Sequence, residues 1–333
     1  MKDTSLEIVI VNWNSKEYLK ECLRSISIST KSKFKLDRVT VVDNASTDYS
    51  LDGVENIDIP LNIILNSENK GFGTACNQGG LNSNSRYLLF LNPDTVLSKD
   101  SLDIAVEFIE EPINHQVGVS GIQLVDDQGE TQRNCSRFPT PISFWCDIFG
   151  ISKIFKNKLT SHLMTEWNHD STQQVDHVIG AFYLIRTEIF RSLNGFDEDY
   201  FVYLEDLDLS YRVNQAGWSC YYLNECRSFH KGGGTSEQVK PYRLFYSLNS
   251  KIIYSYKHFT LINAILINVA CVTIEPFTRI CFALLKRSFD DVANTIQAYS
   301  LLLKYIIHNY PRQISKIIKE NNSIKKHLKG DDQ

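Results

Sequence analysis

The sequence predicts an α/β protein with a mostly parallel central sheet flanked by helices and with a helical C-terminal extension. Short apolar runs alternate with segments of helical periodicity over the first part of the chain. Strands that are separated by helices are typical of a parallel, doubly wound sheet. From about residue 237 onward the strand signals stop, and apolar and basic segments indicate helices.

Four short runs near the N-terminus are the expected parallel strands, because they are rich in β-branched and other apolar residues. They are residues 6–11, 39–43, 61–65 and 87–91. Ser15 can cap the helix that follows the first of these strands. A second helix is expected over residues 74–83, after a glycine-containing turn.

The middle of the chain predicts a mixture of strands and helix. Residues 117–125 and 175–186 have the composition of strands, and Gly180 interrupts the second of them. A helix is expected from Glu205 onward, because the apolar residues that follow fall on one side. Gly217 is a plausible stop for that helix.

The composition of the 333 residues excludes several classes of protein. Hydrophobic content of 43% and charged content of 22% are ordinary for a folded chain, and a net charge of −4 does not indicate a nucleic-acid partner. The eight cysteines form no C-x-x-C pair, so zinc ribbons and thioredoxin-like redox chemistry are not expected. We expect reduced thiols in a cytoplasmic protein, with no leader segment before the first strand.

Two of the expected strands end in acidic and amide residues, which indicates a ligand site. Asn92-Pro93-Asp94 follows the fourth strand, and the proline stops the ladder because it has no N–H to donate. Asp43 and Asn44 end the second strand in a similar way. Open α/β sheets bind ligands at the carboxyl ends of their strands, so a nucleotide and a hard cation are expected there.

Several short motifs follow one another along the chain. They are Val-Val-Asp43-Asn44-Ala-Ser-Thr-Asp48, Asn69-x-Gly71-Phe72-Gly73-x-x-x-Asn77-x-Gly79, Leu-Asn92-Pro93-Asp94, Gly180-Ala181-Phe182, Glu205-Asp206-x-Asp208-Leu-x-x-Arg212 and His230-x-x-Gly233. In this order they resemble a family 2 glycosyltransferase of the GT-A fold, in the branch of bacterial rhamnosyltransferases and galactofuranosyltransferases. The resemblance covers residues 6 to 236, and its motifs are specific together and weak singly.

The resemblance implies a division of labour along the chain. Residues 1–115 would form the nucleotide-sugar-binding half of the GT-A domain, and residues 116–236 the acceptor-binding and catalytic half. Residues 237–333 remain a helical C-terminal region. The implied activity is inverting transfer, with L-rhamnose from dTDP-rhamnose as the expected sugar and a lipid-linked or polysaccharide acceptor in the synthesis of cell-surface glycan such as O-antigen.

The resemblance also implies a site for Mg²⁺ or Mn²⁺, which would neutralise charge on the leaving diphosphate. Asp94 matches the last acid of the family's D-x-D metal motif, and His230 matches a histidine that joins the metal or the diphosphate in some relatives. Asn92 stands where the motif has its first Asp, and this departure lowers the local negative charge. A strand-end cap is the other interpretation of Asp94, and a loop or core histidine that of His230.

A second group of residues is expected to bind the nucleotide. Asp43 resembles the family residue that pairs with the pyrimidine N3–H, and Gly71 would let the backbone approach the nucleotide closely. Asp48 is expected to cap the following turn. The predicted nucleotide-binding residues are Asn12, Asp43, Asn44, Asn69, Gly71, Asn77 and Asn92.

Asp206 matches the acid that serves as general base in the family, and Glu205 is expected to bind or orient the acceptor. The other interpretation of this acidic run is a solvated helix start, in which Asp208 and Arg212 simply pair as a helix salt bridge. The arginines of segment 132–140 would contact the diphosphate or the phosphate of a lipid-linked acceptor, or stand on the surface. Residues 232–234, all glycine, predict a loop that closes over the donor.

Alternatives to this function remain open. The donor would instead be UDP-galactofuranose or another UDP-hexose, or the chain would be a non-catalytic nucleotide-sugar-binding subunit of a polysaccharide assembly complex. A nucleotidyltransferase is disfavoured, because Asn12-Trp13-Asn14 follows the first strand in place of a glycine-rich basic loop.

The C-terminal region predicts contact with the inner face of the cell membrane. The apolar runs 259–274 and 280–285 are too short to span a bilayer, and a tail rich in lysine follows them. Such a segment suits a peripheral protein on an anionic membrane surface. Packing against the rest of the chain, or against a second subunit in a homo-oligomer, is the other interpretation.

Overall fold

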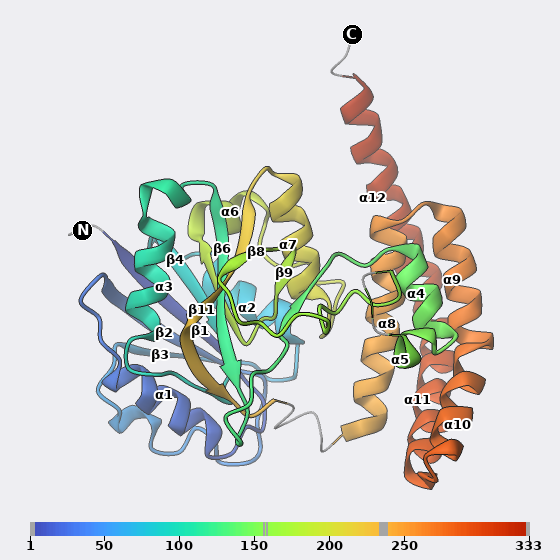
Figure 1. The fold of residues 1–333 in the computed structure, drawn as a ribbon, viewed down its shortest axis with the longest axis horizontal. Coiled ribbons are helices and arrows are strands. Elements are labelled where there is room, and N and C mark those ends of the chain that lie inside the picture. Colours follow the sequence, from blue (N-terminus) through green and yellow to red (C-terminus); the bar gives the residue numbers. More distant parts are fainter. Residues whose placement is uncertain (1–3, 156, 158, 233–238, 331–333) are drawn as a thin grey trace. The chain divides into compact units, whose positions relative to one another are not determined.

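A computed structural model describes residues 4–155, 157, 159–232 and 239–330, with side chains to residue 320 (Figure 1). The chain forms two compact units. The sheet unit comprises Met1–Phe138, Leu163–Phe201 and Glu205–Gln238, and the helical unit comprises Pro139–His162, Val202–Leu204 and Val239–Gln333.

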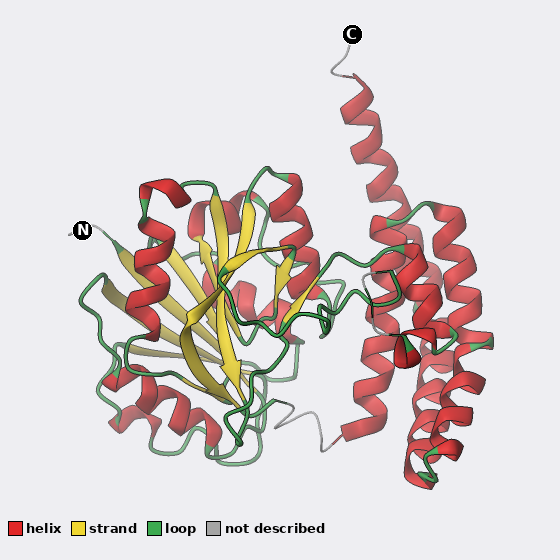
Figure 2. Cartoon of the chain, viewed as in Figure 1, coloured by secondary structure: helices red, strands yellow, loops and turns green. Residues whose placement is uncertain are grey.

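The sheet unit is built on a nine-stranded sheet with the order β3-β2-β1-β4-β10-β6-β11-β5, and β8 pairs with β11 (Figure 2). Strands β1 to β4 run parallel, whereas β10 lies antiparallel between β4 and β6. The strands are β1 (Ser5–Asn12), β2 (Lys35–Asp43), β3 (Leu61–Leu65), β4 (Tyr87–Leu91), β5 (Thr95–Val96), β6 (Val117–Val125), β7 (Cys135–Ser136), β8 (Gln173–Val175), β9 (His177–Val178), β10 (Phe182–Arg186) and β11 (Ser219–His230). The predicted α/β class and mostly parallel sheet are therefore confirmed.

Helices cover both faces of this sheet. Neighbouring residues of β1 point to opposite sides: Ile8 belongs to the core cluster that contains residues of α1 and α3, while Val9 belongs to the cluster that contains residues of α2, α6 and α7. Strands buried on both faces need apolar residues at every position, which is why they read as continuous apolar runs. The helical elements of this unit are α1 (Tyr18–Ile28), η1 (Val54–Asn56), α2 (Phe72–Gly80), α3 (Ser101–Glu110), η2 (Pro112–Asn114), α6 (Thr187–Ser192) and α7 (Glu205–Gln215).

The expected cap of α1 is wrong. The helix begins at Tyr18, and its N-cap residue Glu17 makes no side-chain capping bond. The hydroxyl of Ser15 instead donates to the Asn12 side-chain oxygen, because Asn12 is buried at the end of β1 and needs a partner there.

The helical unit contains two short helices from the middle of the chain and the predicted C-terminal helices. Glu275 and Pro276 open α10, where proline costs no hydrogen bond because the first N–H groups of a helix have no internal partner. Its helices are α4 (Pro141–Ile148), α5 (Ile151–Ile154), α8 (Lys240–His258), α9 (Leu261–Thr273), α10 (Glu275–Leu285), α11 (Phe289–His308) and α12 (Tyr310–Gly330).

None of the described helices is by itself long and apolar enough to cross a bilayer. By length and composition, α9 and α10 meet that requirement only as a pair, and a bend of 42° separates them. The lysine-rich tail lies in α12, where Lys316 is 3.9 Å from Glu320. The side chains of the later lysines lie outside the described residues.

A buried ion cluster ties α8 to α10 inside the helical unit. Glu275 is fully buried and accepts hydrogen bonds from Lys251, at 3.2 and 3.3 Å, and from Arg279, at 2.7 and 2.9 Å. Burial by itself raises the pKa of a carboxyl, but the two cations outweigh it and hold the pKa of Glu275 at about 2.

Candidate active site

The segment Asn92-Pro93-Asp94, which we call the metal motif after the resemblance, forms a tight turn at the end of β4. The Asn92 N–H donates to the Ala181 carbonyl at 3.1 Å, and the Thr95 N–H donates back to the Asn92 carbonyl at 3.1 Å. This turn presents Asp94, which is 8% exposed, between β4 and the two-residue strand β5. Strand β5 pairs with the end of β11, with Thr95 opposite His230, so residues far apart in sequence meet here.

Asp94 and His230 lie side by side, as the resemblance implied. Asp94 Oδ1 is 3.4 Å from His230 Nε2, and Asn92 Nδ2 is 3.5 Å from the same nitrogen. Gln132 holds the ring from the other side: its Nε2 donates to the His230 carbonyl at 2.7 Å, and its Oε1 is 2.9 Å from His230 Nδ1. This orientation of the amide places an acceptor oxygen against Nδ1, and Nε2 is the ring nitrogen that faces Asp94.

Asp94 and His230 fit a divalent cation that takes most of its ligands from water and substrate phosphates. Ligands at about 2.1 Å in an octahedron stand about 3 Å apart, close to the separation of Asp94 Oδ1 and His230 Nε2. Among the described residues, no three His, Cys, Asp or Glu side chains come together as a complete metal cage. Mg²⁺ and Mn²⁺ sites that also use substrate phosphates and water need only one or two protein carboxylates.

Asp206 lies in the first turn of α7 and is held from two directions. Its Oδ2 accepts the Gly180 N–H at 2.7 Å and lies 3.7 Å from His177 Nε2. A Cβ on Gly180 would stand 3.3 Å from that oxygen, so only glycine gives the carboxylate this approach without displacement. Asp206 keeps 18% of its side chain exposed, so it is reachable by a substrate.

His177 connects Asp206 to a buried hydroxyl chain. Its Nδ1 is 2.9 Å from the Ser210 hydroxyl, which is 3.0 Å from the Tyr183 hydroxyl. Ser210 follows Asp206 by four residues on α7, so one face of that helix presents both to the imidazole. Burial lowers the pKa of His177 against the opposing charges of Asp206 and Asp176, so the ring favours its neutral form.

Glu205 occupies a very different environment from its neighbour. The side chain is 4% exposed and packs against α2, where its Cβ would be 3.7 Å from a Cβ on Gly73. Its Oε2 is buried without a hydrogen-bond partner among the described residues. Burial and then the charge of Asp206 raise the pKa of Glu205 well above its usual range, which favours the neutral carboxyl.

Two adjacent residues join the metal motif to the acidic helix. Gly180 donates its N–H to Asp206, and Ala181 accepts the N–H of Asn92 through its carbonyl. Strand β10 begins directly after them, with Phe182 opposite Leu91 of β4. The segment before β10 therefore holds Asp206 and the Asn92–Asp94 turn at the same end of the central strands.

A third group of predicted residues lies at the ends of β1 and β2. Asp43 Oδ1 accepts from Asn12 Nδ2 at 2.7 Å, and Asp43 Oδ2 accepts the Ser46 N–H at 3.0 Å. Asn44 Nδ2 donates to the Gly71 carbonyl at 3.1 Å. Asn69 Oδ1 accepts the Gly71 N–H at 3.0 Å, so these residues form one polar patch around the turn before α2.

Asn77 stands apart from this patch. Its Nδ2 donates to the Phe196 carbonyl and to Glu198, both at 2.9 Å, and its Oδ1 accepts the Phe196 N–H at 2.8 Å. The amide is thus fully used in tying α2 to the loop before α7.

The structure also describes Asp48, the pair Asp208 and Arg212, and the first glycine of the predicted closing loop. Asp48 accepts the Ser50 N–H at 3.1 Å, as a residue that caps a turn does. Asp208 and Arg212 form the expected helix salt bridge, at 2.7 Å. Gly232 has a left-handed φ of 68°, and the remaining two glycines of the predicted closing loop lie outside the described residues.

The two arginines of segment 132–140, Arg133 and Arg137, make hydrogen bonds and an ion pair within the sheet unit. Arg133 donates to the Thr165 carbonyl and, at 3.3 Å, to Asn168 Oδ1, and Arg137 pairs with Glu166. Both guanidinium groups thus contact the stretch between α5 and β8.

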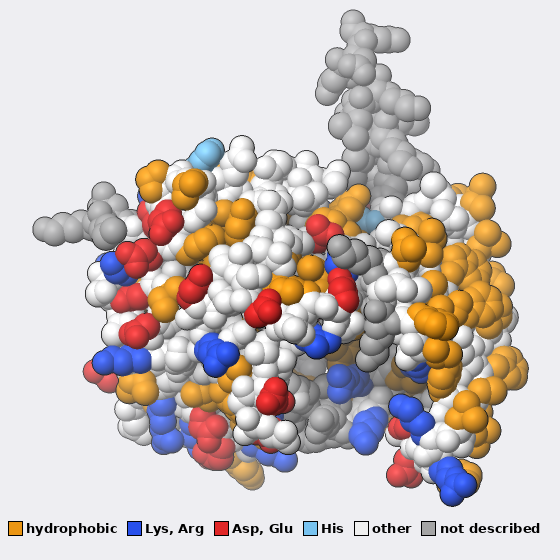
Figure 3. Space-filling view, viewed as in Figure 1, with side chains coloured by type: hydrophobic (Ala, Val, Ile, Leu, Met, Phe, Trp, Pro, Cys, Tyr) orange, Lys and Arg blue, Asp and Glu red, His pale blue; other side chains and the backbone are white. Residues whose placement is uncertain are grey.

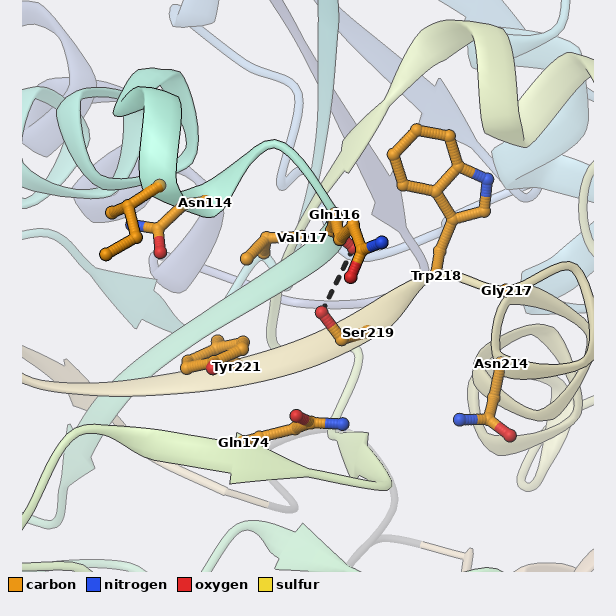
Figure 4. A pocket seen from close by; sticks show the side chains of 10 residues that line it. Asn114, Gln116, Val117, Gln174, Asn214, Gly217, Trp218, Ser219 and Tyr221 are labelled. Atoms are coloured by element: carbon orange, nitrogen blue, oxygen red, sulfur yellow. Dashed lines mark hydrogen bonds between the residues drawn. The ribbon is translucent and has the colours of Figure 1, made fainter.

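A polar cavity of about 310 Å³ lies at the opposite ends of β6 and β11 (Figure 4). Gln116, Gln174, Trp218 and Tyr221 are among the residues that line it, and the Ser219 hydroxyl donates to the Gln116 carbonyl at 3.0 Å. Because β11 ends at His230, its first residues and this cavity are far along the strand from the metal motif. None of the predicted site residues lines it.

Sequence reasoning missed His177 and gave no role to Gln132. Asp176 and His177 are polar residues in the predicted strand 175–186, shortly before Gly180 of a recognised motif, and that placement was the available signal. Gln132 carried no comparable signal, because its contact with His230 spans 98 residues.

Comparisons with known proteins identify the family of the chain. The family model described as glycosyl transferase family 2 matches residues 7–192. The rhamnosyltransferase WbbL of Escherichia coli K12 is 26% identical over 67% of this chain and 82% of its own length. An N-acetylglucosaminyl-diphospho-decaprenol L-rhamnosyltransferase of Mycobacterium tuberculosis is 25% identical over 68% of this chain and 75% of its own.

Solved structures support the fold. A mannosyltransferase from Pyrobaculum calidifontis, PcManGT, in complex with GDP-Man and Mn2+, gives a TM-score of 0.52 at 17% identity, covering 94% of this chain and 84% of that one. Residues 1–349 of Staphylococcus aureus TarS give 0.50 at 16% identity, covering 90% and 92%. The chain belongs to glycosyl transferase family 2, has the GT-A fold, and is a glycosyltransferase of the rhamnosyltransferase-like branch.

Proposed function

We propose that the chain is an inverting transferase that moves L-rhamnose from dTDP-rhamnose onto a lipid-linked sugar in the synthesis of a cell-surface glycan. The observation that carries the proposal is the segment Gly180–Ala181, which holds Asp206 through the Gly180 N–H and the Asn92–Asp94 turn through the Ala181 carbonyl. A partly exposed carboxylate thereby stands at the same end of the sheet as the two side chains that would hold a cation, and transfer from a nucleotide sugar requires both.

Asp206 acts as the general base. The acceptor oxygen attacks the anomeric carbon, a new C–O bond forms, and the bond from that carbon to the diphosphate oxygen breaks with its electron pair. The acceptor's proton passes to Asp206 as attack proceeds, the type of assistance that contributes about 10²–10⁴-fold in rate. Attack from the face opposite the leaving group inverts the configuration at carbon.

His177 is a positioning residue for this base. A neutral imidazole has one N–H, and we assign it to Nε2, facing Asp206, because Ser210 can donate to Nδ1 while it accepts from Tyr183. Oδ2 of the carboxylate then accepts the Gly180 N–H and faces the imidazole N–H at 3.7 Å, while Oδ1 accepts the Leu207 N–H at 2.8 Å and keeps a lone pair for the acceptor's proton.

Asp94 and the Nε2 of His230 would hold Mg²⁺ or Mn²⁺, and Gln132 would fix the ring in the ligating tautomer. When bound, the cation supplies positive charge against the diphosphate. Mn2+ is present with the nucleotide sugar in the PcManGT structure, which supports a divalent cation here. Turnover should therefore stop in excess chelator and return with added Mn²⁺, and Asp94→Ala should abolish it.

Asp43 receives the pyrimidine. Each of its carboxylate oxygens already accepts one hydrogen bond, and each retains a lone pair for the base N3–H. Asn12, Asn44, Asn69, Gly71 and Asn92 surround the nucleotide in this proposal. Asn77 supports α2 instead of touching the ligand.

The curated relatives support the sugar and the acceptor. Both are named rhamnosyltransferases, and the mycobacterial relative is named for a diphospho-decaprenol acceptor. A comparable acceptor here would be a sugar linked through diphosphate to a polyprenol, offered at the cytoplasmic face of the membrane.

The test is thermal unfolding of the full chain with a panel of nucleotide sugars, each with and without Mn²⁺. A ligand that binds only the native protein at about 100 times its Kd stabilises it by about 2.7 kcal/mol. We expect dTDP-rhamnose to raise the Tm most and UDP-galactofuranose less, and a larger shift with a UDP-hexose would overturn the assigned donor. No shift with any sugar nucleotide would overturn nucleotide-sugar binding itself, for the catalytic and the non-catalytic alternative alike.

A further inference from the structure

The helical unit exposes most of the large apolar side chains that stand on the surface. Of the 26 such side chains exposed among the described residues, 20 belong to this unit, although it is the smaller of the two. Single exposed apolar residues are ordinary, but a contiguous patch marks an interaction site.

These side chains gather over α9 and α10, where orange dominates the right of Figure 3. On α9 they recur at helical spacing on the side opposite the buried Ala264 and Ile267. A second group lies at the turn between α10 and α11. We name these two groups together the apolar face, and it includes Leu261, Ile262, Ile265, Leu266, Leu285 and Phe289, which are 45–80% exposed.

The two units also carry opposite net charge. The helical unit holds 17 of the 35 lysines and arginines but only seven of the 39 aspartates and glutamates, which gives it a net charge of +10 and leaves −14 on the sheet unit. The overall charge of −4 conceals this division.

Cations interrupt the apolar face at its second part. Lys286 and Arg287 are exposed between Leu285 and Phe289, in the turn that joins α10 to α11. The two acids that follow them lie in the first turn of α11, where the helix dipole stabilises negative charge.

We propose that the apolar face docks on the surface of an anionic phospholipid bilayer. Leucine and isoleucine side chains of α9 would enter the boundary between headgroups and acyl chains, and Lys286 and Arg287 would meet lipid phosphates. At 13 residues, α9 is about 20 Å long and lies along the surface, because a bilayer core is about 30 Å thick. The docking concerns where the enzyme is held, so it goes beyond the proposed reaction.

A second copy of the chain fits the apolar face less well. Two copies that met through it would bring together two units of net charge +10, and such self-repulsion opposes association. An anionic bilayer offers an apolar interior and negative charge at the same surface, and so matches both properties of this region.

The test is co-flotation of the full chain with phosphatidylcholine vesicles that contain about one-third phosphatidylglycerol, at low and at high salt. The test variant is Ile262→Gln/Ile265→Gln on α9, whose side chains are 72% and 45% exposed. The matched control is Ile28→Gln/Ile113→Gln on the sheet unit, whose side chains are 72% and 84% exposed. All four positions are exposed, so neither variant should unfold.

We expect the α9 variant to bind roughly 10²-fold more weakly, since each isoleucine loses about tenfold, and the control to bind as the parent chain does. Lys286→Gln/Arg287→Gln should bind roughly fivefold more weakly for each charge removed, and its binding should depend less steeply on salt concentration.

Equal binding of the α9 variant and the control would overturn the proposal. So would a parent chain that stays with the soluble fraction at low salt and is dimeric unless α9 is changed. None of these readouts depends on turnover, so they stand apart from the identity of the sugar.

Discussion

The two units of this chain place their apolar residues in opposite ways. In the sheet unit, the strands bury both faces between helices, and this unit holds only six of the 26 large apolar side chains exposed among the described residues. In the helical unit, a smaller core leaves the outer side of α9 and the turn after α10 apolar and exposed, on a strongly basic background. The difference indicates that one unit is built to work on a nucleotide sugar and the other to lie against a partner.

The largest effect is expected at Asp206, in the sheet unit. Asp206→Asn keeps the shape of the side chain but accepts no proton, so turnover should fall by about 10²–10⁴-fold while donor affinity stays unchanged. Glu205→Gln is the matched control, since Glu205 is buried and already favours its neutral form. Initial-rate kinetics of both variants check this, and a loss as great in Glu205→Gln would shift the base to Glu205.

In the helical unit the largest effect is one of stability. Glu275→Gln leaves Lys251 and Arg279 buried without a counter-charge, which should lower the free energy of unfolding by about 3–5 kcal/mol. Glu320→Gln, on an exposed pair 3.9 Å from Lys316, should change it by less than about 1 kcal/mol. Urea unfolding of the two variants measures the difference.

The same carboxylate predicts how stability depends on pH. Its folded-state pKa of about 2 lies below the ordinary value of 4.5, so Glu275 contributes stability above pH 4.5 and loses it as pH falls toward 2. The contribution is about 3 kcal/mol. The parent chain should therefore lose stability more steeply than Glu275→Gln between these values, and parallel curves would contradict the ion cluster.

A smaller effect is expected at Asp43. Asp43→Ala removes a charged hydrogen-bond acceptor for the base and should weaken binding of free dTDP by about 1–3 kcal/mol. Asp52→Ala makes the same change on an exposed residue that follows β2 and should leave affinity unaltered. Calorimetric titration distinguishes them, and equal affinities would move the pyrimidine elsewhere.

The smallest effect is expected at His177. His177→Leu should lower kcat by roughly tenfold, about 1.4 kcal/mol, because Asp206 loses the polar imidazole that faces it at 3.7 Å. His177→Gln retains an N–H and should recover part of the rate, while KM for the donor stays constant in both. If both variants lose stability equally and Gln gives no rescue of kcat, His177 has only a packing role.

Much of the fold was predictable because the strands of the sheet unit are marked by short local patterns in the sequence. Strands β3, β4 and β6 begin and end at the expected residues, since each is an apolar run bounded by polar or turn residues. The start of α1 was not predictable from Ser15, because the hydroxyl is taken by a buried asparagine that only the folded sheet brings near.

In the candidate site, too, some features were predictable from the sequence and others depend on how the chain folds. The juxtaposition of Asp94 with His230 followed from a family resemblance, and the pairing of β5 with β11 supplies its physical cause. The different environments of Glu205 and Asp206 were not predictable, because they depend on which side chain α2 covers. The opposite charges of the two units were hidden for a different reason: the helical unit is assembled from three separate stretches of sequence.

That assembly has a consequence for anyone who wishes to divide this protein. The chain passes from one unit to the other five times, and three of the residues counted with the helices, Val202–Leu204, immediately precede Glu205. Within the helical unit, the Ser250 hydroxyl donates to the Val202 carbonyl at 2.8 Å. Tyr203 and Leu204 both have left-handed φ angles, 71° and 65°, at a cost of about 1–2 kcal/mol each. A C-terminal truncation that removes α8 would thus remove the Ser250 partner of the very turn that leads into α7. Chimaeras with other family members should keep 139–162 and 202–204 together with their own C-terminal helices.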